Sequence, residues 1–317
     1  MKLKFSIIIP VYNRPKEIDE LLASLTKQNY SNDFEVLVIE DGSTEKSDTI
    51  VKKYKNKLTI RYFYKANSGA GASRNFGMQQ ATGNYFIILD SDVIVPPDYL
   101  LEVKKGLTIN YTAAFGGPDA AHKNFTPLQK AINYSMTSVL TTGGIRGKKK
   151  AVGKFQPRSF NLGVSKEAFN ITKGFSNMKN GEDIDFTFRL WEKGYKTQLI
   201  TKAFVYHKRR SSIQQFFKQT FGFGTARPIL NKKYPSTAKI TYWFPSLFIL
   251  GIFFSSLAAM FDYYIFLCFY VFYLLLLFID ATIQNNNIYV GILSLFTSIT
   301  QFLGYGLGFL KSQIFKK

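Results

Sequence analysis

The 317-residue sequence contains very little cysteine and histidine. Its one cysteine, Cys268, excludes an internal disulfide framework, and its two histidines are too few for a Cys/His metal cluster. A cation held by oxygen ligands stays compatible with this composition. Acidic residues are scarce as well, because 21 Asp and Glu stand against 41 Lys and Arg, a formal net charge of +20. This excess indicates an anionic partner, which is nucleic acid, a lipid surface or a phosphorylated small molecule.

Charge is almost absent from the C-terminal region. Between Ile240 and Leu310 the only charged residues are Asp262 and Asp280, and they separate three apolar runs rich in Phe, Leu, Ile and Tyr. A helix of about 20 apolar residues crosses the hydrocarbon core of a bilayer. We therefore expect a membrane region at residues 240–317 with two or three hydrophobic helices, because a soluble protein would have no core for three such runs.

A basic segment without any acidic residue precedes the apolar runs. It fits the cytoplasmic membrane surface, by the positive-inside bias and by attraction to anionic lipid, and residues 226–239 are predicted to form its juxtamembrane part. Three full crossings would put Lys311 and the two terminal lysines outside, against the same bias, so we favour two crossings and one membrane-lying segment. The basic residues of the segment are Lys208, Arg209, Arg210, Lys218, Arg227, Lys232, Lys233 and Lys239.

The N-terminus lacks the pattern of a signal peptide. Its first residues carry two lysines and an apolar run only long enough for a strand. The localisation expected from the sequence is therefore the inner (cytoplasmic) membrane, with the N-terminal domain facing the cytosol.

Strand-like and helix-like patterns alternate in the N-terminal part of the chain. Phe5–Val11 is a continuous apolar run, typical of a strand buried on both faces of a parallel sheet. Pro15 then begins a helical stretch whose apolar residues recur at i, i+3, i+4 and i+7. Further strands are expected at residues 34–40, 58–64 and 85–90. This alternation predicts an α/β fold with a right-handed parallel sheet and ligands at the carboxyl ends of its strands.

Acidic residues follow the second and fourth expected strands. Asp41 belongs to an Asp-Gly-Ser sequence, and Asp90 and Asp92 form an Asp-x-Asp pair. In an extended segment, side chains two residues apart point the same way, so this pair could present both carboxylates to one cation. Oxygen ligands suit Mg²⁺ or Mn²⁺, which bridge carboxylates to nucleotide phosphates. A plain turn is the alternative for a lone Asp-x-Asp, but its place after a buried strand favours the metal site.

Two glycine-rich segments are candidates for contact with phosphates. Residues 67–77 (NSGAGASRNFG) could approach a ligand closely, and the helix that follows offers N–H groups to an anion, although a simple loop is the alternative. The segment is neither a Walker A loop nor a dinucleotide fingerprint. The second segment could order over phosphates or be a solvated loop. Its basic residues are Arg146, Lys148, Lys149, Lys150, Lys154 and Arg158.

Taken together, the motifs occur in a characteristic order. They are PVYNR, Asp-Gly-Ser, NSGAGASRNFG, ILDSDVIV, Asn161-Leu-Gly, Gly174-Phe175, Gly181-Glu182-Asp183-Ile-Asp185, Arg189, Gly194-Tyr195 and a strand ending at His207. In this order they resemble family 2 glycosyltransferases of the GT-A fold, of the membrane-anchored bacterial type that makes exopolysaccharides and cell-surface glycans. The resemblance covers roughly residues 4–225, and it implies a Rossmann-like GT-A domain at residues 1–225.

The resemblance also implies a metal site and an acceptor site. In such enzymes the Asp-x-Asp pair and a divalent cation, Mn²⁺ or Mg²⁺, hold the diphosphate of a nucleotide sugar. Inverting transfer needs a base for the acceptor hydroxyl, and by motif position Asp183 is the base and Glu182 orients the acceptor. Both could instead be ordinary acids at a helix N-terminus. Asp185 is interpreted as structural or supporting.

His207 resembles the extra metal ligand or diphosphate contact of several GT-A enzymes, and a structural histidine is the alternative. His122 has no such context. The donor is expected to be a UDP-sugar. Its predicted contacts are Pro10, Tyr12, Asp41, Asn67, Arg74 and Asp90.

The function implied is transfer of one sugar from a nucleotide-diphosphate donor to a hydroxyl of a lipid-linked saccharide in surface polysaccharide assembly. A polyprenyl-phosphate monosaccharide synthase is the first alternative, but its acceptor phosphate is already anionic and has little need of the Glu182-Asp183 pair. A processive synthase would carry Gln-x-x-Arg-Trp, whereas Gln215–Gln219 lacks both the Arg and the Trp.

Other classes of protein fit the sequence less well. A nucleotidyltransferase would carry its glycine-rich phosphate loop after the first strand. A catalytically silent nucleotide-sugar-binding membrane protein would have no need to keep Asp90, Asp92 and Asp183 together. Nucleic acid is not an expected partner, because the basic residues gather beside the membrane runs and no nucleic-acid module is recognised. Membrane lipids are expected partners, and a homo-oligomer stays open.

Overall fold

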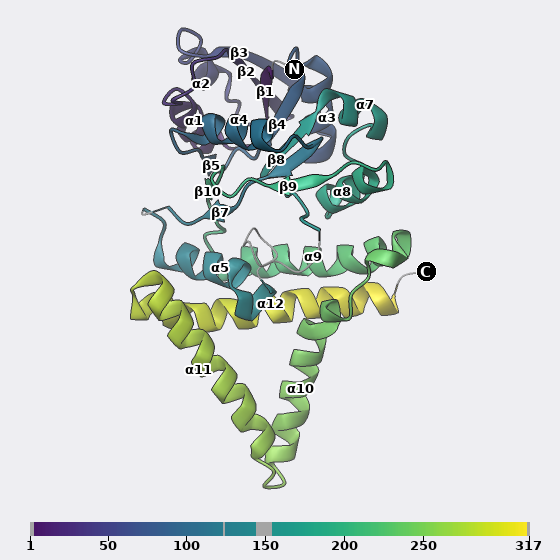
Figure 1. Ribbon diagram of the computed structural model, residues 1–317. Coiled ribbons are helices and arrows are strands. Elements are labelled where there is room, and N and C mark those ends of the chain that lie inside the picture. Colours follow the sequence, from purple (N-terminus) through teal and green to yellow (C-terminus); the bar gives the residue numbers. More distant parts are fainter. Residues whose placement is uncertain (1–2, 123, 144–153, 316–317) are drawn as a thin grey trace. The chain divides into compact units, whose positions relative to one another are not determined.

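The structure is a computed structural model that describes residues 3–122, 124–143 and 154–315. The described residues form two compact units (Figure 1). The first unit comprises residues 1–122 and 146–208, and the second comprises residues 123–145 and 209–317. These units do not coincide with the predicted domains, since residues 209–225 belong to the second unit. The functional limits 1–225, 226–239 and 240–317 stay a prediction.

A seven-stranded sheet forms the centre of the first unit (Figure 1). Its strands, in spatial order, are β3 (Thr59–Lys65), β2 (Phe34–Asp41), β1 (Phe5–Val11), β4 (Tyr85–Leu89), β8 (Asn161–Ser165), β6 (Ala114–Gly116) and β9 (Thr197–Leu199). The four predicted strands β1 to β4 are present and parallel. The parallel arrangement ends at β8, for which no strand was predicted and which runs antiparallel to both of its neighbours.

Alternate residues of the central strand β1 supply two separate hydrophobic cores. Ile7 and Ile9 are fully buried with α1 (Pro15–Leu25), α2 (Asp48–Lys52) and α4 (Tyr99–Ile109) on one face of the sheet. Ile8 is fully buried on the other face, which is covered by the helices α3 (Ala70–Gln80), α7 (Lys166–Thr172) and α8 (Glu182–Glu192). The continuous apolar run of β1 is thus explained, because burial of each such side chain contributes roughly 2 kcal/mol and both faces are covered.

A small second sheet brings distant parts of the chain to the end of β4. Its order is β5 (Val93–Ile94), β10 (Val205–His207) and β7 (Asp119–Ala120). β10 runs antiparallel to β5, so that His207 lies opposite Val93. β10 is also parallel to β7, with Val205 opposite Asp119. The sheet therefore places His207 next to the Asp-x-Asp sequence that precedes β5.

The described part of the second unit is helical (Figure 1). Its elements are α5 (Pro127–Thr137), α6 (Val139–Thr142), α9 (Ile213–Lys233), the 3₁₀ turns η1 (Pro235–Thr237) and η2 (Ile240–Trp243), α10 (Phe244–Ala259), α11 (Ile265–Asn285) and α12 (Ile288–Ile314). Helix α12 packs along α9, and glycines allow the close approach. A Cβ added at Gly224 would lie 2.1 Å from the carbonyl oxygen of Tyr305, and one at Gly308 would lie 2.3 Å from that of Phe221.

Three segments are long and apolar enough to cross a membrane, as predicted. They are Ile240–Ala259, Ile265–Asn285 and Ile288–Ile314, and half of the most apolar window of the last is buried inside the structure. In Figure 1, α10 and α11 form a hairpin that leads away from α12. The acid in α11 has partners within the unit, because Asp280 accepts a 2.7 Å hydrogen bond from Tyr134 Oη of α5. The number of crossings stays a prediction.

Candidate active site

Asp90, Asp92 and His207 form a group of side chains that could hold a metal ion. Each offers one ligand atom, and these atoms lie within 4.8 Å of one another. The sequence predicted that an extended segment would point both Asp side chains the same way, and this was wrong. Ser91 and Asp92 lie in a turn, which is closed by a 3.3 Å hydrogen bond from Val93 N to Asp90 O. The turn nevertheless brings both carboxylates to the histidine. Two carboxylates and an imidazole suit Mn²⁺, and the carboxylates also suit Mg²⁺.

Two cationic or potentially cationic groups surround the carboxylate of Asp92. Arg14, which follows β1, forms an ion pair with Asp92 Oδ2, and His207 Nε2 lies 3.3 Å from Asp92 Oδ1. Burial acts to raise the pKa of Asp92, but His207 and Arg14 outweigh burial and hold this pKa below its usual range. Asp92 is therefore ionised at neutral pH, as a metal ligand must be.

The ring of His207 is held from two sides. Its Nδ1 lies 3.9 Å from Oδ2 of Asp119, a buried residue of β7. Its face stacks on Phe160, with ring centroids 4.8 Å apart. These contacts direct Nε2 toward Asp92, which is the arrangement of a metal-binding histidine oriented by a carboxylate behind it.

Arg74 of α3 joins the Asp-x-Asp region to the acids of α8. Its buried guanidinium donates one hydrogen bond of 2.8 Å to Asp90 and another of 2.9 Å to Glu182. It also lies over the ring of Phe175, 5.2 Å from the centroid. Through this one side chain, the start of α8 is fixed on the same side of the site as Asp90.

The two acids at the start of α8 have different surroundings. Burial, followed by the charge of Asp183, raises the pKa of Glu182 against the opposing effect of Arg74. Asp183 Oδ2 accepts a weak 3.4 Å hydrogen bond from Ser159 N and lies 3.9 Å from Arg158 Nη1. Asp183 Oδ1 accepts a 2.8 Å bond from Ile184 N of its own helix. Such neighbouring carboxyl groups with different environments are suited to different roles in acid–base chemistry.

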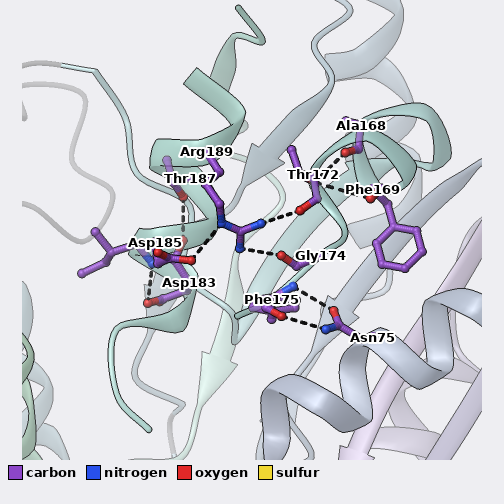
Figure 2. Close-up of polar contacts among 11 residues, drawn as sticks. Asn75, Ala168, Phe169, Thr172, Gly174, Phe175, Asp183, Asp185, Thr187 and Arg189 are labelled. Atoms are coloured by element: carbon purple, nitrogen blue, oxygen red, sulfur yellow. Dashed lines mark hydrogen bonds and ion pairs between the residues drawn. The ribbon is translucent and has the colours of Figure 1, made fainter. Parts of the chain in front are cut away.

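Asp185 serves the local scaffold (Figure 2). It is fully buried and pairs with Nε of Arg189 at 2.9 Å, while that guanidinium donates to the carbonyl oxygens of Thr172 and Gly174 at 2.5 and 2.6 Å. Figure 2 also shows Asn75 of α3 bonded to both backbone groups of Phe175, each at 2.8 Å. These contacts hold the segment before α8 and therefore fix the position of Glu182 and Asp183.

The glycine-rich segment is a short loop followed directly by helix. α3 begins at Ala70 after Gly69, whose φ of 88° a residue with a side chain rarely adopts. Asp41 caps this start, because its carboxylate accepts hydrogen bonds from Ser68 N at 3.0 Å and Gly69 N at 2.9 Å and pairs with Lys65. Within the helix, Gly77 permits packing on β1, since an added Cβ would lie 2.4 Å from a methyl of Ile8. This glycine serves packing, and not a phosphate.

The residues predicted to contact the donor at the ends of β1 and β2 and in the loop before α3 differ in their exposure to solvent. Tyr12 is 53% exposed, and Asn67, also exposed, donates a 2.9 Å bond to the carbonyl of Asp41. Pro10 is partly buried within β1, and Asp41 is almost fully buried. Tyr12 and Asn67 thus have free surface for a ligand, while Asp41 holds the loop. Their roles toward a donor stay predictions.

Three neighbours of the site were missed by reasoning from the sequence. Arg14 was visible as the last residue of PVYNR, and Asp119 follows a Gly-Gly-Pro turn, but nothing in the sequence shows their partners. Arg158 was assigned to a basic loop, whereas it lies beside Asp183. Lys154 lies 5.7 Å from the centre of the Trp191 ring. The remaining basic residues of that segment, Arg146, Lys148, Lys149 and Lys150, lie outside the described residues.

Comparison with known proteins decides the family. The family model of "Glycosyl transferase family 2" matches residues 6–169. The chain belongs to this family. Over 93 residues it is 45% identical to the poly(ribitol-phosphate) beta-N-acetylglucosaminyltransferase TarS of Staphylococcus aureus, a match covering 28% of this chain and 16% of TarS. It is 26% identical over 263 residues to the chondroitin synthase of Escherichia coli, covering 73% of this chain and 38% of that enzyme. The chain thus matches well under half the length of either relative.

Solved structures confirm the GT-A fold. A crystal structure of S. aureus TarS residues 1–349 superposes with a TM-score of 0.51 and 25% identity, covering 71% of this chain and 65% of that one. The mannosyltransferase PcManGT of Pyrobaculum calidifontis, in complex with GDP-Man and Mn²⁺, superposes with a TM-score of 0.63 over 100% of this chain and 89% of that one. At 15% identity, the second likeness concerns the fold alone. The chain is therefore a member of glycosyltransferase family 2 with a Rossmann-like GT-A domain and three C-terminal helices apolar enough to span a membrane.

Proposed function

We propose that this protein is an inverting, metal-dependent glycosyltransferase that moves one sugar from a UDP-sugar to a hydroxyl of a lipid-linked saccharide. The reaction would belong to surface polysaccharide assembly, on the cytosolic side of the inner membrane. The observation that carries the proposal is the Arg74 bridge, by which Asp90 of the metal group and Glu182 of α8 share one buried guanidinium. A donor held by the first group would have its anomeric carbon close to acids that can receive an acceptor.

The residues at the end of β4 fit a divalent cation. Asp90, Asp92 and His207 would hold it, and when bound it would neutralise charge developing on the departing diphosphate. Arg14 keeps Asp92 ionised and would help to balance the diphosphate charge. Asp119 and Phe160 would keep the imidazole in position. Tyr12, Asn67 and the loop that Asp41 supports are proposed to contact the nucleoside, with Pro10 shaping the end of β1.

The acids of α8 are proposed to act on the acceptor. Asp183 would accept the proton of the attacking hydroxyl, and Arg158 Nη1 lies 3.9 Å from its Oδ2. Glu182 would orient the acceptor from its fixed place against Arg74. Inversion follows if the hydroxyl attacks from the side opposite the diphosphate.

Support for the substrates comes from relatives and from the second unit. TarS is named as an N-acetylglucosaminyltransferase, and one of its crystal structures is titled as a complex with UDP-GlcNAc. The names of these relatives refer to two polymers, poly(ribitol-phosphate) and chondroitin, and both polymers carry hydroxyl groups, which favours a hydroxyl as the acceptor. The three apolar helices favour an acceptor carried on a lipid.

The test is a donor and acceptor screen with the full-length protein in detergent. UDP-glucose, UDP-galactose, UDP-GlcNAc and GDP-mannose are compared with Mn²⁺, with Mg²⁺ and with a chelator, each with a lipid-linked saccharide and with polyprenyl phosphate. We expect metal-dependent transfer from a UDP-sugar to the saccharide. Transfer to polyprenyl phosphate alone would replace this function by that of a monosaccharide synthase. Absence of both transfer and donor hydrolysis would indicate a silent nucleotide-sugar-binding protein.

A further inference from the structure

Arg227 of α9 is a buried cation that has no counter-ion among the described residues. Only 8% of its surface is exposed, and its Nη1 atom is enclosed without any hydrogen-bond partner. Within the described residues no hydrogen bond or ion pair involves this side chain. Its one specific contact is with the ring of Tyr242, over which the guanidinium lies at 4.2 Å from the centroid. Burial of a charge is costly unless the charge is paired, so a cation–π contact worth about 2 kcal/mol compensates it only in part.

The second unit offers no carboxylate to Arg227. Asp262 and Asp280 are the only acids in residues 123–145 and 209–317. Asp262 accepts a hydrogen bond from Tyr264 near the end of the α10–α11 hairpin, and Asp280 is bonded to Tyr134 and Gln284. Basic side chains, by contrast, are close in the sequence, on α9, on α12 or just before η2. They are Lys232, Lys233, Lys239 and Lys311.

Two further polar atoms of the same helices are buried without a partner. They are Oδ1 of Asn231, one turn after Arg227 on α9, and Oγ of Ser312 on α12. The helices run in parallel, because Gly304 packs on the carbonyl oxygen of Phe217 while Gly308, one turn later, packs on that of Phe221. Ser312, one turn beyond Gly308, therefore comes to the level of Arg227 along the helix pair. The Ser312 hydroxyl can donate a hydrogen bond to the same anion that a guanidinium would bind.

The location of Tyr242 suggests where that anion comes from. Tyr242 lies near the start of the first apolar segment, Ile240–Ala259, and is followed by Trp243, whose ring contacts that of Phe309 with centroids 4.9 Å apart. Tyr and Trp at the start of a membrane segment are typical of the interface, at the height of the lipid headgroups. Arg227 stacks on this tyrosine and is therefore at the depth of lipid phosphate.

We propose that Arg227 is the centre of a binding site for the phosphate group of a membrane lipid. Its planar guanidinium matches two phosphate oxygens, and the hydroxyl of Ser312 would donate one more hydrogen bond to the phosphate. Such a site differs from the diffuse attraction of a basic surface to anionic lipid, because it is saturable and depends on one oriented side chain.

The test measures lipid binding to the full-length protein by native mass spectrometry and by thermal unfolding in a neutral maltoside detergent. The probes are dioleoylphosphatidylglycerol, undecaprenyl phosphate, inorganic phosphate and, as a lipid without phosphate, dioleoylglycerol. We expect one phosphate lipid to bind saturably and to raise the unfolding midpoint, and dioleoylglycerol to do neither. The phospholipid, the polyprenyl phosphate and the free ion are compared at equal concentration, so that the tightest one identifies the source of the phosphate.

Variants then assign the site to its residue. Arg227→Gln is expected to weaken phosphate-lipid binding by about tenfold or more, because a charge-assisted pair of hydrogen bonds is lost. Lys232→Gln, which removes the same charge from an exposed position on the same helix, is the matched control and is expected to change binding by less than about threefold. Arg227→Lys, which keeps the charge and loses the planar fork, should fall between the two.

Two results would overturn the proposal. One is that the wild-type protein binds none of the probes saturably. This measurement does not depend on whether Arg227→Gln folds. The other is that Arg227→Gln binds the phosphate lipid as tightly as Lys232→Gln does. If Arg227→Gln does not fold, Arg227→Lys takes its place in this comparison. Equal affinities would assign the binding to overall charge. No sugar donor or acceptor is present in these measurements, so their outcome is independent of the transferase assay.

Discussion

Single charges determine what the end of β4 can bind. Asp92 contacts Arg14 and His207 at once, and both hold its pKa below the usual range. A cation that entered the group would share this carboxylate with Arg14, so the arginine tunes the affinity of the site as well as the charge of Asp92. Arg74 likewise pairs with two acids, because its one guanidinium contacts both Asp90 and Glu182.

Asp92→Asn is expected to abolish metal-linked donor binding, because a neutral amide is a poor ligand for a hard cation and leaves Arg14 without its partner. Calorimetry of UDP binding with and without Mn²⁺ should show a loss of more than about 100-fold in the metal-dependent part. Asp48→Asn, at a partly exposed position of α2, is the control. Undiminished Mn²⁺-linked binding by Asp92→Asn would refute the metal role.

Asp119 is predicted to act on the metal through His207. Asp119→Ala should weaken Mn²⁺ binding by about 10- to 100-fold, because the imidazole loses the carboxylate behind it. Electron paramagnetic resonance of free Mn²⁺ measures this without any turnover. In a His207→Gln background, Asp119→Ala should weaken Mn²⁺ binding little further, because the imidazole through which Asp119 acts is already absent. Independent, additive losses would mean that Asp119 supports the fold and not the ligand.

Asp183→Asn separates binding from chemistry. The variant should bind a UDP-sugar as the wild type does, since Asp183 contacts Ser159 and Arg158 and none of the metal group. Transfer should fall by about 10²- to 10⁴-fold if Asp183 is the base. Single-turnover transfer and donor binding, measured on one preparation, give both numbers. Near-normal transfer would remove Asp183 from this role.

The charged residues of the site are positioned by individual strands and helices, and the short strands among them could not be predicted from the sequence. Strands β1 to β4 follow from apolar runs that are buried on both faces. β5, β7 and β10 have two or three residues each and carry no periodicity, so their pairing depends on the tertiary fold. The same is true of β8, whose antiparallel direction no local pattern encodes. The acids of the site were recognisable from motif order, but the partners of Arg14 and Asp119 became visible only in the folded structure.

The start of α3 gives a prediction for stability against pH. Asp41 caps this helix, and its pKa is lowered in the folded protein, because hydrogen bonds from Lys65 and Ser68 outweigh the effect of burial. Its stabilising contribution is therefore present above the unfolded-state pKa of about 3.9 and is lost as the pH falls through the lower folded-state value. Asp41→Asn should lower the unfolding midpoint at pH 7 by the equivalent of about 2 kcal/mol.

The pH series distinguishes this cap from a general loss of packing. Thermal unfolding in detergent should show the difference between Asp41→Asn and the wild type shrinking as the pH is lowered from 5 to 3. Asp48→Asn, whose side chain is partly exposed and pairs with Lys52, should show a small difference throughout. A deficit of Asp41→Asn that is the same at every pH would contradict the assigned role of the charge.

At the scale of the whole molecule, the arrangement of the apolar helices favours two membrane crossings. The segment Ile240–Ala259, with 20 residues, spans about 30 Å as a helix, and α11, with 21 residues, spans slightly more. Half of the apolar window of α12 is instead buried in the unit, where the helix packs along α9. A helix that is already packed on one side by a basic helix suits the membrane surface better than its interior.

Cysteine labelling tests this topology, because Cys268 is the only native cysteine. In a Cys268→Ser background, Tyr263→Cys places a thiol between α10 and α11, and Lys311→Cys places one near the end of α12. With two crossings, a membrane-impermeant maleimide added to intact cells should label position 263, and position 311 should react only after the membrane is permeabilised. Three crossings would expose position 311 from outside and contradict the membrane-lying α12. Labelling of neither position in intact cells would mean that the hairpin enters the bilayer without crossing it.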